Sequence, residues 1–242
     1  MKMRLMRFLG WGLLPILAGL AACKSEKERE STSEMEPDGI FHDYQVNANE
    51  DTDSVTVLLY FREYDEFGYG LRLDTPATIL FDGQAVPAYK LEIPGSYYEV
   101  NRYAPDFAGR HSIQYTDKRG QLAEIPFNYQ PMQVVSELPA VLTSDSLLIQ
   151  LSGVDSGDIV HIVLTDTTYA GEGIERLDTV YGGKILISAG ELASLAPGPV
   201  QLELIRETSR ELGEEGHMRG QLRTTYHIRR EMTLAERKAV RR

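Results

Sequence analysis

The 242-residue sequence contains one cysteine, Cys23, and one tryptophan, Trp11. A single cysteine excludes an intramolecular disulfide, so packed apolar cores must supply the stability of the fold. The sequence also has no phosphate-binding glycine loop, no paired-histidine zinc motif and no glycine-flanked nucleophilic serine. The nearest approach to the last motif, Gly153-Val154-Asp155-Ser156-Gly157, has the wrong spacing. These absences predict a protein that is not an enzyme and that holds no metal and no cofactor.

Long helix-periodic stretches are absent as well, and the one long apolar run is residues 8–22. Its 15 residues fall short of the roughly 20 that a membrane-spanning helix needs. It is interrupted by residues that lower helix propensity, which are Gly10, Gly12, Pro15 and Gly19. Three cations precede it, Lys2, Arg4 and Arg7. This order is typical of a removable signal segment rather than of a permanent anchor.

The end of this stretch, Leu20-Ala21-Ala22-Cys23, resembles the lipobox of bacterial lipoproteins. The resemblance implies a signal peptide over residues 1–22, cleavage before Cys23, and acylation of Cys23 (palmitate among the acyl groups) as a membrane anchor. Lys24 stands where an inner-membrane retention signal would place Asp, so the resemblance favours the outer membrane, on its periplasmic or its cell-surface face. A transmembrane helix and an ordinary thiol are the alternatives, and a lone cysteine behind a signal-like segment favours lipidation.

The mature chain would be strongly acidic. Removing residues 1–22 takes away three of the 25 basic residues and none of the 36 acidic ones, so the formal charge falls from −11 to −14. Phosphate backbones repel such a chain, and we expect no nucleic-acid partner. After Cys23, residues 24–38 contain no apolar residue except Met35 and lack periodicity, which predicts a disordered tether over residues 23–38.

Residues 39–131 contain short alternating segments separated by turn residues, which is typical of an antiparallel sandwich. Over residues 55–61 the odd positions are apolar, which predicts a strand with one buried face. A second strand over residues 78–81 is followed by Asp82-Gly83, a strong signal for a two-residue hairpin turn.

Residues 107–120 resemble the last hairpin of bacterial immunoglobulin-like domains, with a glycine, an alternating strand and Thr-Asp-x-x-Gly at the turn. The returning strand covers residues 122–129 and contains Pro126. Because proline cannot donate to a β-ladder, this strand should lie at the edge of its sheet.

The same pattern repeats over residues 132–230, after the boundary Gln130-Pro131-Met132. Alternation predicts strands around residues 147–151 and 160–164, and a final hairpin with a polar loop at residues 208–217.

Between these strands, Ser188 and Glu191 form a capping-box pattern for one helical turn, which immunoglobulin-like sandwiches often carry at a corner. Residues 231–242 form a basic C-terminal tail. The predicted fold class is therefore all-β, with two tandem immunoglobulin-like β-sandwiches after a signal peptide and a disordered tether.

Ten of the 13 tyrosines lie in the first predicted sandwich. Loops at one end of that sandwich would place four aromatic residues beside two cations, forming a binding patch of Tyr64, Phe67, Tyr69, Tyr97, Lys118 and Arg119. Aromatic rings and arginine dominate the binding energy of interfaces. The alternative is that some of these rings cap the end of the core, because only a contiguous exposed cluster is informative.

Other polar groups have a structural interpretation. His111 alternates with Ile113 and should be a satisfied core histidine. The acidic turns at residues 50–53 and 155–158 lack the full spacing of a calcium loop and should be solvated turns. A basic stripe with outward parity should form cross-strand charge pairs with acidic and amide residues of the preceding strand; the stripe is Arg219, Arg223, His227 and Arg229, and its partners are Gln201, Glu203 and Glu207.

These features predict a non-enzymatic lipoprotein, anchored through Cys23 at the outer membrane, that acts as a protein-interaction or spacer module for another protein of the cell envelope. The alternative is a glycan-binding accessory lipoprotein of a polysaccharide-uptake system. The loss of Trp11 with the signal peptide counts against the glycan alternative, because tryptophan offers the largest stacking face.

Overall fold

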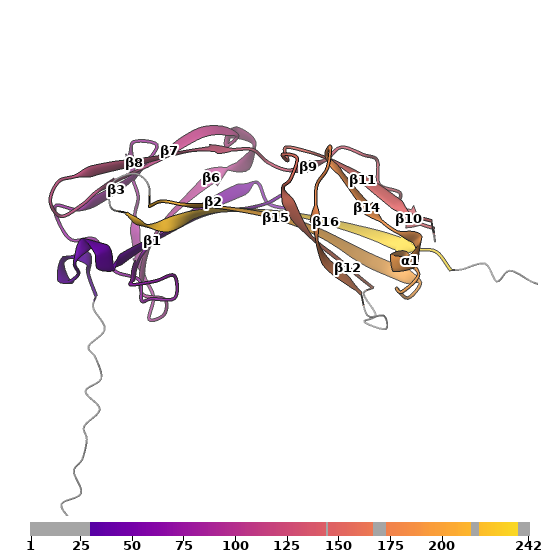
Figure 1. Ribbon diagram of the computed structural model, residues 1–242, viewed down its shortest axis with the longest axis horizontal. Helices are drawn as coiled ribbons and strands as arrows, with labels where there is room; N and C mark the ends of the chain where they lie inside the picture. The colour runs from indigo at the N-terminus through magenta and orange to yellow at the C-terminus, as the bar shows by residue number, and fades with distance from the viewer. Residues whose placement is uncertain (1–29, 144, 167–172, 214–217, 237–242) are drawn as a thin grey trace, which may run out of the picture.

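The computed structural model describes residues 30–143, 145–166, 173–213 and 218–236. The predicted signal peptide and Cys23 lie outside these ranges, within which no helix is long and apolar enough to cross a membrane. Strands dominate, and three β-sheets form two sandwiches arranged end to end (Figure 1).

The first sandwich has the strand arrangement of an immunoglobulin fold. Its strands are β1 (Ile40–Asn49), β2 (Ser54–Glu63), β3 (Thr78–Phe81), β4 (Gln84–Ala85), β5 (Ala88–Lys90), β6 (Ser96–Tyr103), β7 (Gly109–Thr116) and β8 (Leu122–Tyr129). The order β1-β2-β6-β5 on one side corresponds to the ABED sheet of that fold, and β3-β7-β8 on the other side corresponds to its CFG sheet, with β4 added beside β3. A 3-10 turn, η3 (Ala104–Asp106), joins β6 to β7.

The second sandwich follows the same plan. Its elements are β9 (Gln133–Val134), β10 (Val141–Leu142), β11 (Leu147–Ser152), β12 (Ile159–Asp166), β13 (Ile174–Thr179), β14 (Lys184–Ile187), α1 (Ala189–Leu192), β15 (Gly198–Glu211) and β16 (Arg219–Leu234). The order β14-β11-β9 faces β13-β12-β15-β16, with β10 added beside β16. The predicted fold class of sandwich-like all-β sheets is therefore confirmed.

Local sequence signals account for several of these elements. On β2 the buried residues are the predicted odd positions, Val55, Val57, Leu59 and Phe61. Asp82 and Gly83 have φ angles of 48° and 75°, as a hairpin turn with two left-handed residues requires. β8, which contains Pro126, is an edge strand as predicted. Ser188 and Glu191 form the predicted capping box of α1.

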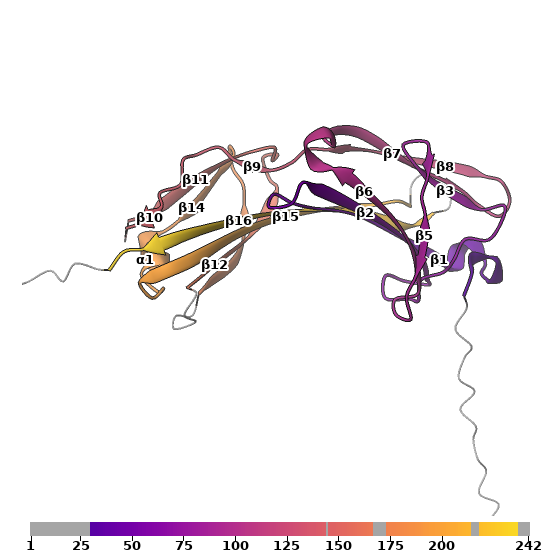
Figure 2. The same cartoon turned by 180° about the vertical axis from the view of Figure 1, so that it is seen from behind.

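One sheet belongs to both sandwiches. The hairpin of β15 and β16 contains 14 and 16 residues, and its far half leaves the second sandwich and lies along the first. There β16 pairs in parallel with β1, from Phe41 opposite Arg219 to Asn49 opposite His227. The result is a nine-stranded sheet that runs the length of the molecule (Figures 1 and 2): eight strands follow the order β13-β12-β15-β16-β1-β2-β6-β5, and the ninth, β10, pairs with β16.

This sheet changes the interpretation of two segments. The polar loop predicted at residues 208–217 is wrong for its first part, because β15 continues to Glu211 and pairs with β16 up to Gln221. The two sandwiches also do not separate at one residue: β15 and β16 come after residue 132 in the chain, yet they extend the sheet of the first sandwich.

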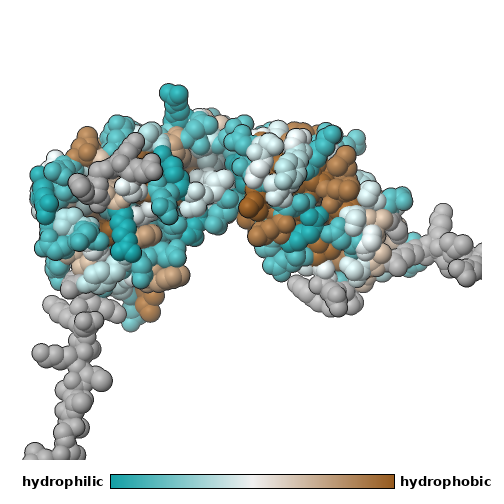
Figure 3. All heavy atoms as spheres, viewed as in Figure 1, coloured by the Kyte–Doolittle hydropathy of each residue, from teal (hydrophilic) through white to brown (hydrophobic). Residues whose placement is uncertain are grey.

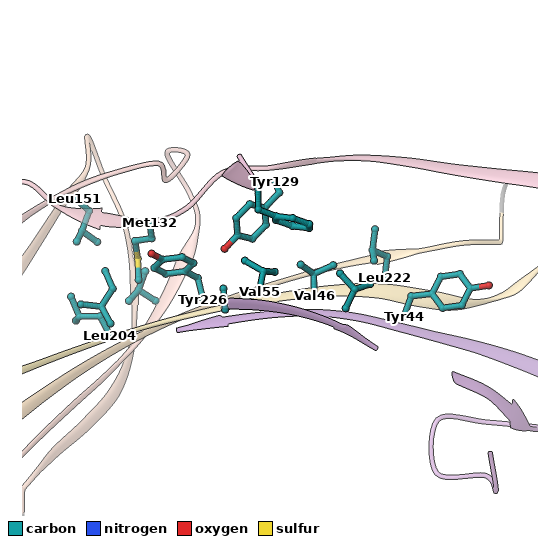
Figure 4. Packing of buried hydrophobic residues seen from close by; sticks show 14 of the residues in the cluster. Tyr44, Val46, Val55, Tyr129, Met132, Leu151, Leu204, Leu222 and Tyr226 are labelled. Carbon is teal, nitrogen blue, oxygen red and sulfur yellow. The ribbon is translucent and has the colours of Figure 1, made fainter. Parts of the chain in front are cut away.

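The junction between the sandwiches is packed. Met132 is fully buried, and the rings of Tyr129 and Tyr226 lie 6.5 Å apart between their centroids (Figure 4). The buried guanidinium of Arg206 donates to the carbonyl oxygens of Gly153 and of Gln130, the latter at 2.6 Å. Connecting residues held in this way do not behave as a free linker.

The prediction of a disordered tether is wrong for residues 31–38. They form two 3-10 turns, η1 (Thr32–Glu34) and η2 (Pro37–Gly39), and Met35 is 97% buried in the core. The backbone N–H of Thr32 donates to the carbonyl of Arg72 at 2.9 Å. One buried apolar side chain, backbone hydrogen bonds and side-chain hydrogen bonds such as that from Ser33 to Asp74 therefore hold this polar segment against the first sandwich.

The beginning of the predicted tail is also part of the fold. β16 runs to Leu234, and both Met232 and Leu234 are buried. Residues 237–242 of the predicted tail lie outside the described residues.

Candidate binding surface at the end of the first sandwich

A cavity of about 480 Å³ opens at the end of the first sandwich that carries the N-terminal turns. Its walls come from η1 and η2, the beginning of β1, the turn between β7 and β8, and Met218 just before β16. Ligand pockets in proteins measure roughly 300–1,000 Å³, so the cavity has the size of a binding site.

The cavity combines apolar walls with a charged rim. Its apolar lining consists of Pro37, Ile40, Leu122, Ala123 and Met218, with the ring of Tyr115. Its charged residues are Asp117, Lys118, Arg119 and Glu124. Such a site can accept an apolar side chain while the rim pairs with charges of either sign around it.

His42 lies in the cavity wall, with only 2% of its surface exposed. Its Nδ1 is 3.0 Å from the hydroxyl of Tyr44, and its ring lies 5.3 Å from the ring of Phe61 and 4.9 Å from that of Tyr115, between centroids. Burial lowers the pKa of His42 from 6.5 to about 3. The imidazole is therefore neutral at neutral pH and contributes hydrogen-bonding capacity without charge.

The structure does not bring all six predicted patch residues together. Lys118 and Arg119 lie at the cavity rim, where Nζ of Lys118 donates to the carbonyl oxygen of Met35 at 2.7 Å. Tyr64 lines a separate hollow with Met35. Residues 31–39 therefore stand between Tyr64 and the two cations.

The remaining three predicted residues belong to two loops that contact each other. Phe67 is exposed on the β2–β3 loop, and the ring of Tyr69 lies against Gly95 of the β5–β6 loop. The N–H of Gly70 donates to the carbonyl of Pro94 at 2.6 Å, which joins the bases of the two loops. Tyr97 follows the second loop on β6.

Tyr97 belongs to a row of three stacked rings on the outer face of the shared sheet, which we call the tyrosine row: Tyr60, Tyr97 and Tyr89. Adjacent centroids are 5.7 and 5.5 Å apart, with interplanar angles of 28° and 24°. The guanidinium of Arg62 lies 4.1 Å from the centroid of Tyr60. Burial raises the pKa of the Tyr60 hydroxyl, and the positive charge of Arg62 partly opposes that shift.

Three of the four residues of the basic stripe, Arg223, His227 and Arg229, form the predicted cross-strand pairs. Arg229 donates to Gln201 at 2.5 Å, and His227 Nε2 lies 3.2 Å from a carboxylate oxygen of Glu203. Arg223 lies 3.7 Å from Glu207. His111 is satisfied in the first sandwich, as predicted: its ring nitrogens lie 2.8 Å from Asp82 and 2.6 Å from the carbonyl of Phe107.

The acidic turns have protein partners. The two carboxylate oxygens of Glu50 accept hydrogen bonds from the guanidinium of Arg230, at 2.5 and 2.9 Å. Asp158 accepts from the N–H of Asp155 at 3.0 Å and lies 3.7 Å from Arg206. Among the residues that the structure describes, no group of three or more His, Cys, Asp or Glu side chains is placed to hold a metal ion.

His42, Thr32, Tyr60 and Tyr89 are not among the site residues predicted from the sequence. A signal for His42 exists, because Ile40, His42, Tyr44, Val46 and Ala48 alternate along β1 and all face the core. The outward parity of Tyr60 follows likewise from the inward odd positions of β2. The stacking partners on β5 and β6 depend on strand pairing, which local sequence does not specify.

Comparisons with known proteins show distant similarities only. No protein-family model matches the sequence, and neither does any curated protein. Solved structures with some similarity include DIP-gamma IG1+IG2 (7% identity, 81% of this chain, 99% of that chain, TM-score 0.21) and a 1.5-MDa bacterial ice-binding adhesin (12%, 81%, 65%, 0.23). A third is the Bacteroides ovatus SGBP-B in complex with a mixed-linkage heptasaccharide (11%, 84%, 46%, 0.21). These similarities are too distant to assign a function.

Replacing His42 tests its buried neutral state. Between pH 6.5 and 3 the unfolded chain binds a proton at this position and the folded chain does not, so stability from this group is complete above pH 6.5 and falls as the pH decreases. We expect His42→Leu to remove up to about 1.4 kcal/mol per pH unit from the slope of unfolding free energy against pH in that window. Urea unfolding from pH 4 to 7 measures it. His161→Gln, on the outer face, is the control, and an unchanged slope in His42→Leu would contradict the assignment.

Proposed function

We propose that the protein is a lipid-anchored, non-enzymatic interaction module of the bacterial outer membrane, which binds another protein of the cell envelope at the end of its first sandwich. The cavity carries this proposal. It offers apolar walls, a neutral buried histidine and a rim with charges of both signs, which suits an apolar side chain presented by a protein segment.

The shape of the body supports a second part of the role, that of a spacer. The described residues begin with Glu30 at one end of the molecule, and β16 ends at the other (Figure 1). The 16 residues of β16 extend for roughly 50 Å at about 3.3 Å per residue. An anchor before Glu30 would hold the first sandwich near the membrane and carry the second sandwich away from it.

The tyrosine row favours glycan binding as a second candidate function. Three rings on one sheet face, with Arg62 beside them, could stack against sugar rings. Because the rings stack on one another, part of each aromatic face is already covered. This observation, together with the lack of tryptophan after residue 11, makes a protein partner the better-supported proposal.

The anchor is tested by the variant Cys23→Ala. The loss of the only thiol removes the acylation site, so we expect the protein to leave the detergent-rich phase and to stay uncleaved or become soluble. Membrane fractionation with detergent phase partitioning measures both effects, and Lys24→Ala is the neighbouring control. Normal outer-membrane yield of Cys23→Ala would contradict the anchor.

The binding site is tested by photo-crosslinking in living cells. A benzophenone amino acid at Arg119, on the cavity rim, should give one discrete adduct, because a bound segment would lie within reach of the probe. The same probe at Glu231, which is exposed on the second sandwich, is the control. Adducts that are absent at position 119, or identical at both positions, would contradict partner binding at the cavity.

A further inference from the structure

Two loops beside the N-terminal turns expose large apolar side chains. We define the loop tip as the β2–β3 loop, residues 64–69, and the β5–β6 loop, residues 91–95. Phe67 is 88% exposed, Ile93 is 83% exposed and Leu91 is 51% exposed. Both loops project below the outer face of the shared sheet (Figures 1 and 2), where hydrophobic residues are visible in Figure 3. Clustered exposed apolar residues mark a surface that contacts a partner or a membrane.

The loop tip is held in place by hydrogen bonds and ion pairs. Gly70 donates to Pro94 at 2.6 Å and accepts from the N–H of Ser96 at 2.8 Å. Glu66 accepts a hydrogen bond from Gln221 at 3.2 Å and lies 3.5 Å from Arg223 of β16. The exposed side chains therefore stand on a fixed base rather than on loose chain.

The chain enters the folded body beside this tip. The carboxylate of Glu30 lies 3.4 Å from Nζ of Lys90, the residue before Leu91, and the carbonyl of Glu30 accepts from the N–H of Arg72. Six residues lie between Cys23 and Glu30, so seven Cα-to-Cα steps give a reach of roughly 25 Å at full extension. A lipid on Cys23 would therefore keep the loop tip within a short distance of the bilayer.

We propose that the loop tip inserts its apolar side chains into the surface of the bilayer that holds Cys23. This inference rests on the anchor of the proposed function. The short segment between Cys23 and Glu30, and its entry into the body beside the loop tip, identify a lipid surface as the partner of the tip. The charges define its chemistry: Asp65 and Glu92 are exposed at the tip, and the amine of Lys90 is paired with Glu30. Electrically neutral headgroups therefore fit better than anionic ones.

Tryptophan reporters test this contact, because Trp11 is the only natural tryptophan and cleavage before Cys23 would remove it. The acylated protein carries Phe67→Trp or Ile93→Trp and is reconstituted into phosphatidylcholine vesicles with and without brominated acyl chains. A side chain at the boundary of headgroups and acyl chains contacts bromine atoms, so we expect at least a roughly twofold loss of emission for both reporters. The control is Leu177→Trp, on the second sandwich and 70% exposed, whose emission should not change.

The outcomes separate the possible occupants. Quenching at both tip positions and not at position 177 supports the proposal. Emission that is unaffected by bromine overturns it, and a blue shift without bromine quenching also overturns it, because that result would assign the tip to a protein or to a second copy of the chain. With brominated acyl chains in both lipids, phosphatidylglycerol vesicles should quench the two tip reporters less than phosphatidylcholine vesicles do. Stronger quenching in phosphatidylglycerol would contradict the inference that the tip prefers electrically neutral headgroups.

Whether Cys23 is acylated is measured separately, from the mass of the peptide that contains it. If that peptide carries no acyl group, the full chain with Trp11→Phe is coupled through its single thiol to a maleimide lipid in the same vesicles. The reporters then test the loop tip even where the proposed function has failed.

Discussion

The parallel pairing of β1 with β16 is the contact on which the rest of the molecule depends. It joins a strand near the beginning of the described chain to the last strand, over nine pairs of residues. Gly220 lies opposite His42, and a Cβ at this glycine would collide with the carbonyl oxygen of His42. The close approach of the two strands therefore requires glycine.

Three consequences follow from this pairing. The last hairpin of the second sandwich extends a sheet of the first, so the two sandwiches share one layer. The shared layer brings Tyr226 against Tyr129 and places Arg206 where it can bind the carbonyl of Gln130, which closes the junction. The pairing also brings Met218 to the end of the first sandwich, where it lines the cavity together with the β7–β8 turn.

The sequence predicts those parts of the fold that local patterns encode. Alternation identifies β2, β11 and β12, the Asp82-Gly83 pair identifies a hairpin, and Pro126 identifies an edge strand. The far half of the final hairpin could not be predicted in this way, because residues 208–211 are polar and exposed and their strand character depends on pairing with β16. Parallel pairing of β1 and β16 joins residues about 180 positions apart, and no local signal specifies such a contact.

The candidate sites too are predicted from the sequence only where local patterns encode them. The loops that carry Tyr64, Tyr69 and Lys118 do lie at one end of the first sandwich, but residues 31–39 separate them, since Met35 is buried in a segment whose composition indicates disorder. The cavity needs walls from three distant parts of the chain, so its residues form no motif. The loop tip is likewise identified only from the structure, because it is defined by the exposure of its apolar side chains and by the nearby point where the chain enters the folded body.

Because β16 pairs with strands of both sandwiches, the two sandwiches should unfold as one cooperative body. Native-state hydrogen exchange, followed by NMR, measures this directly, because each amide reports the free energy of the opening that exposes it. We expect the amides of residues 221–227, in the first sandwich, and those of residues 228–232, in the second, to exchange with the same opening free energy, equal to that of global unfolding. Two distinct free energies on either side of Tyr226, with the second sandwich opening while the first stays protected, would contradict it.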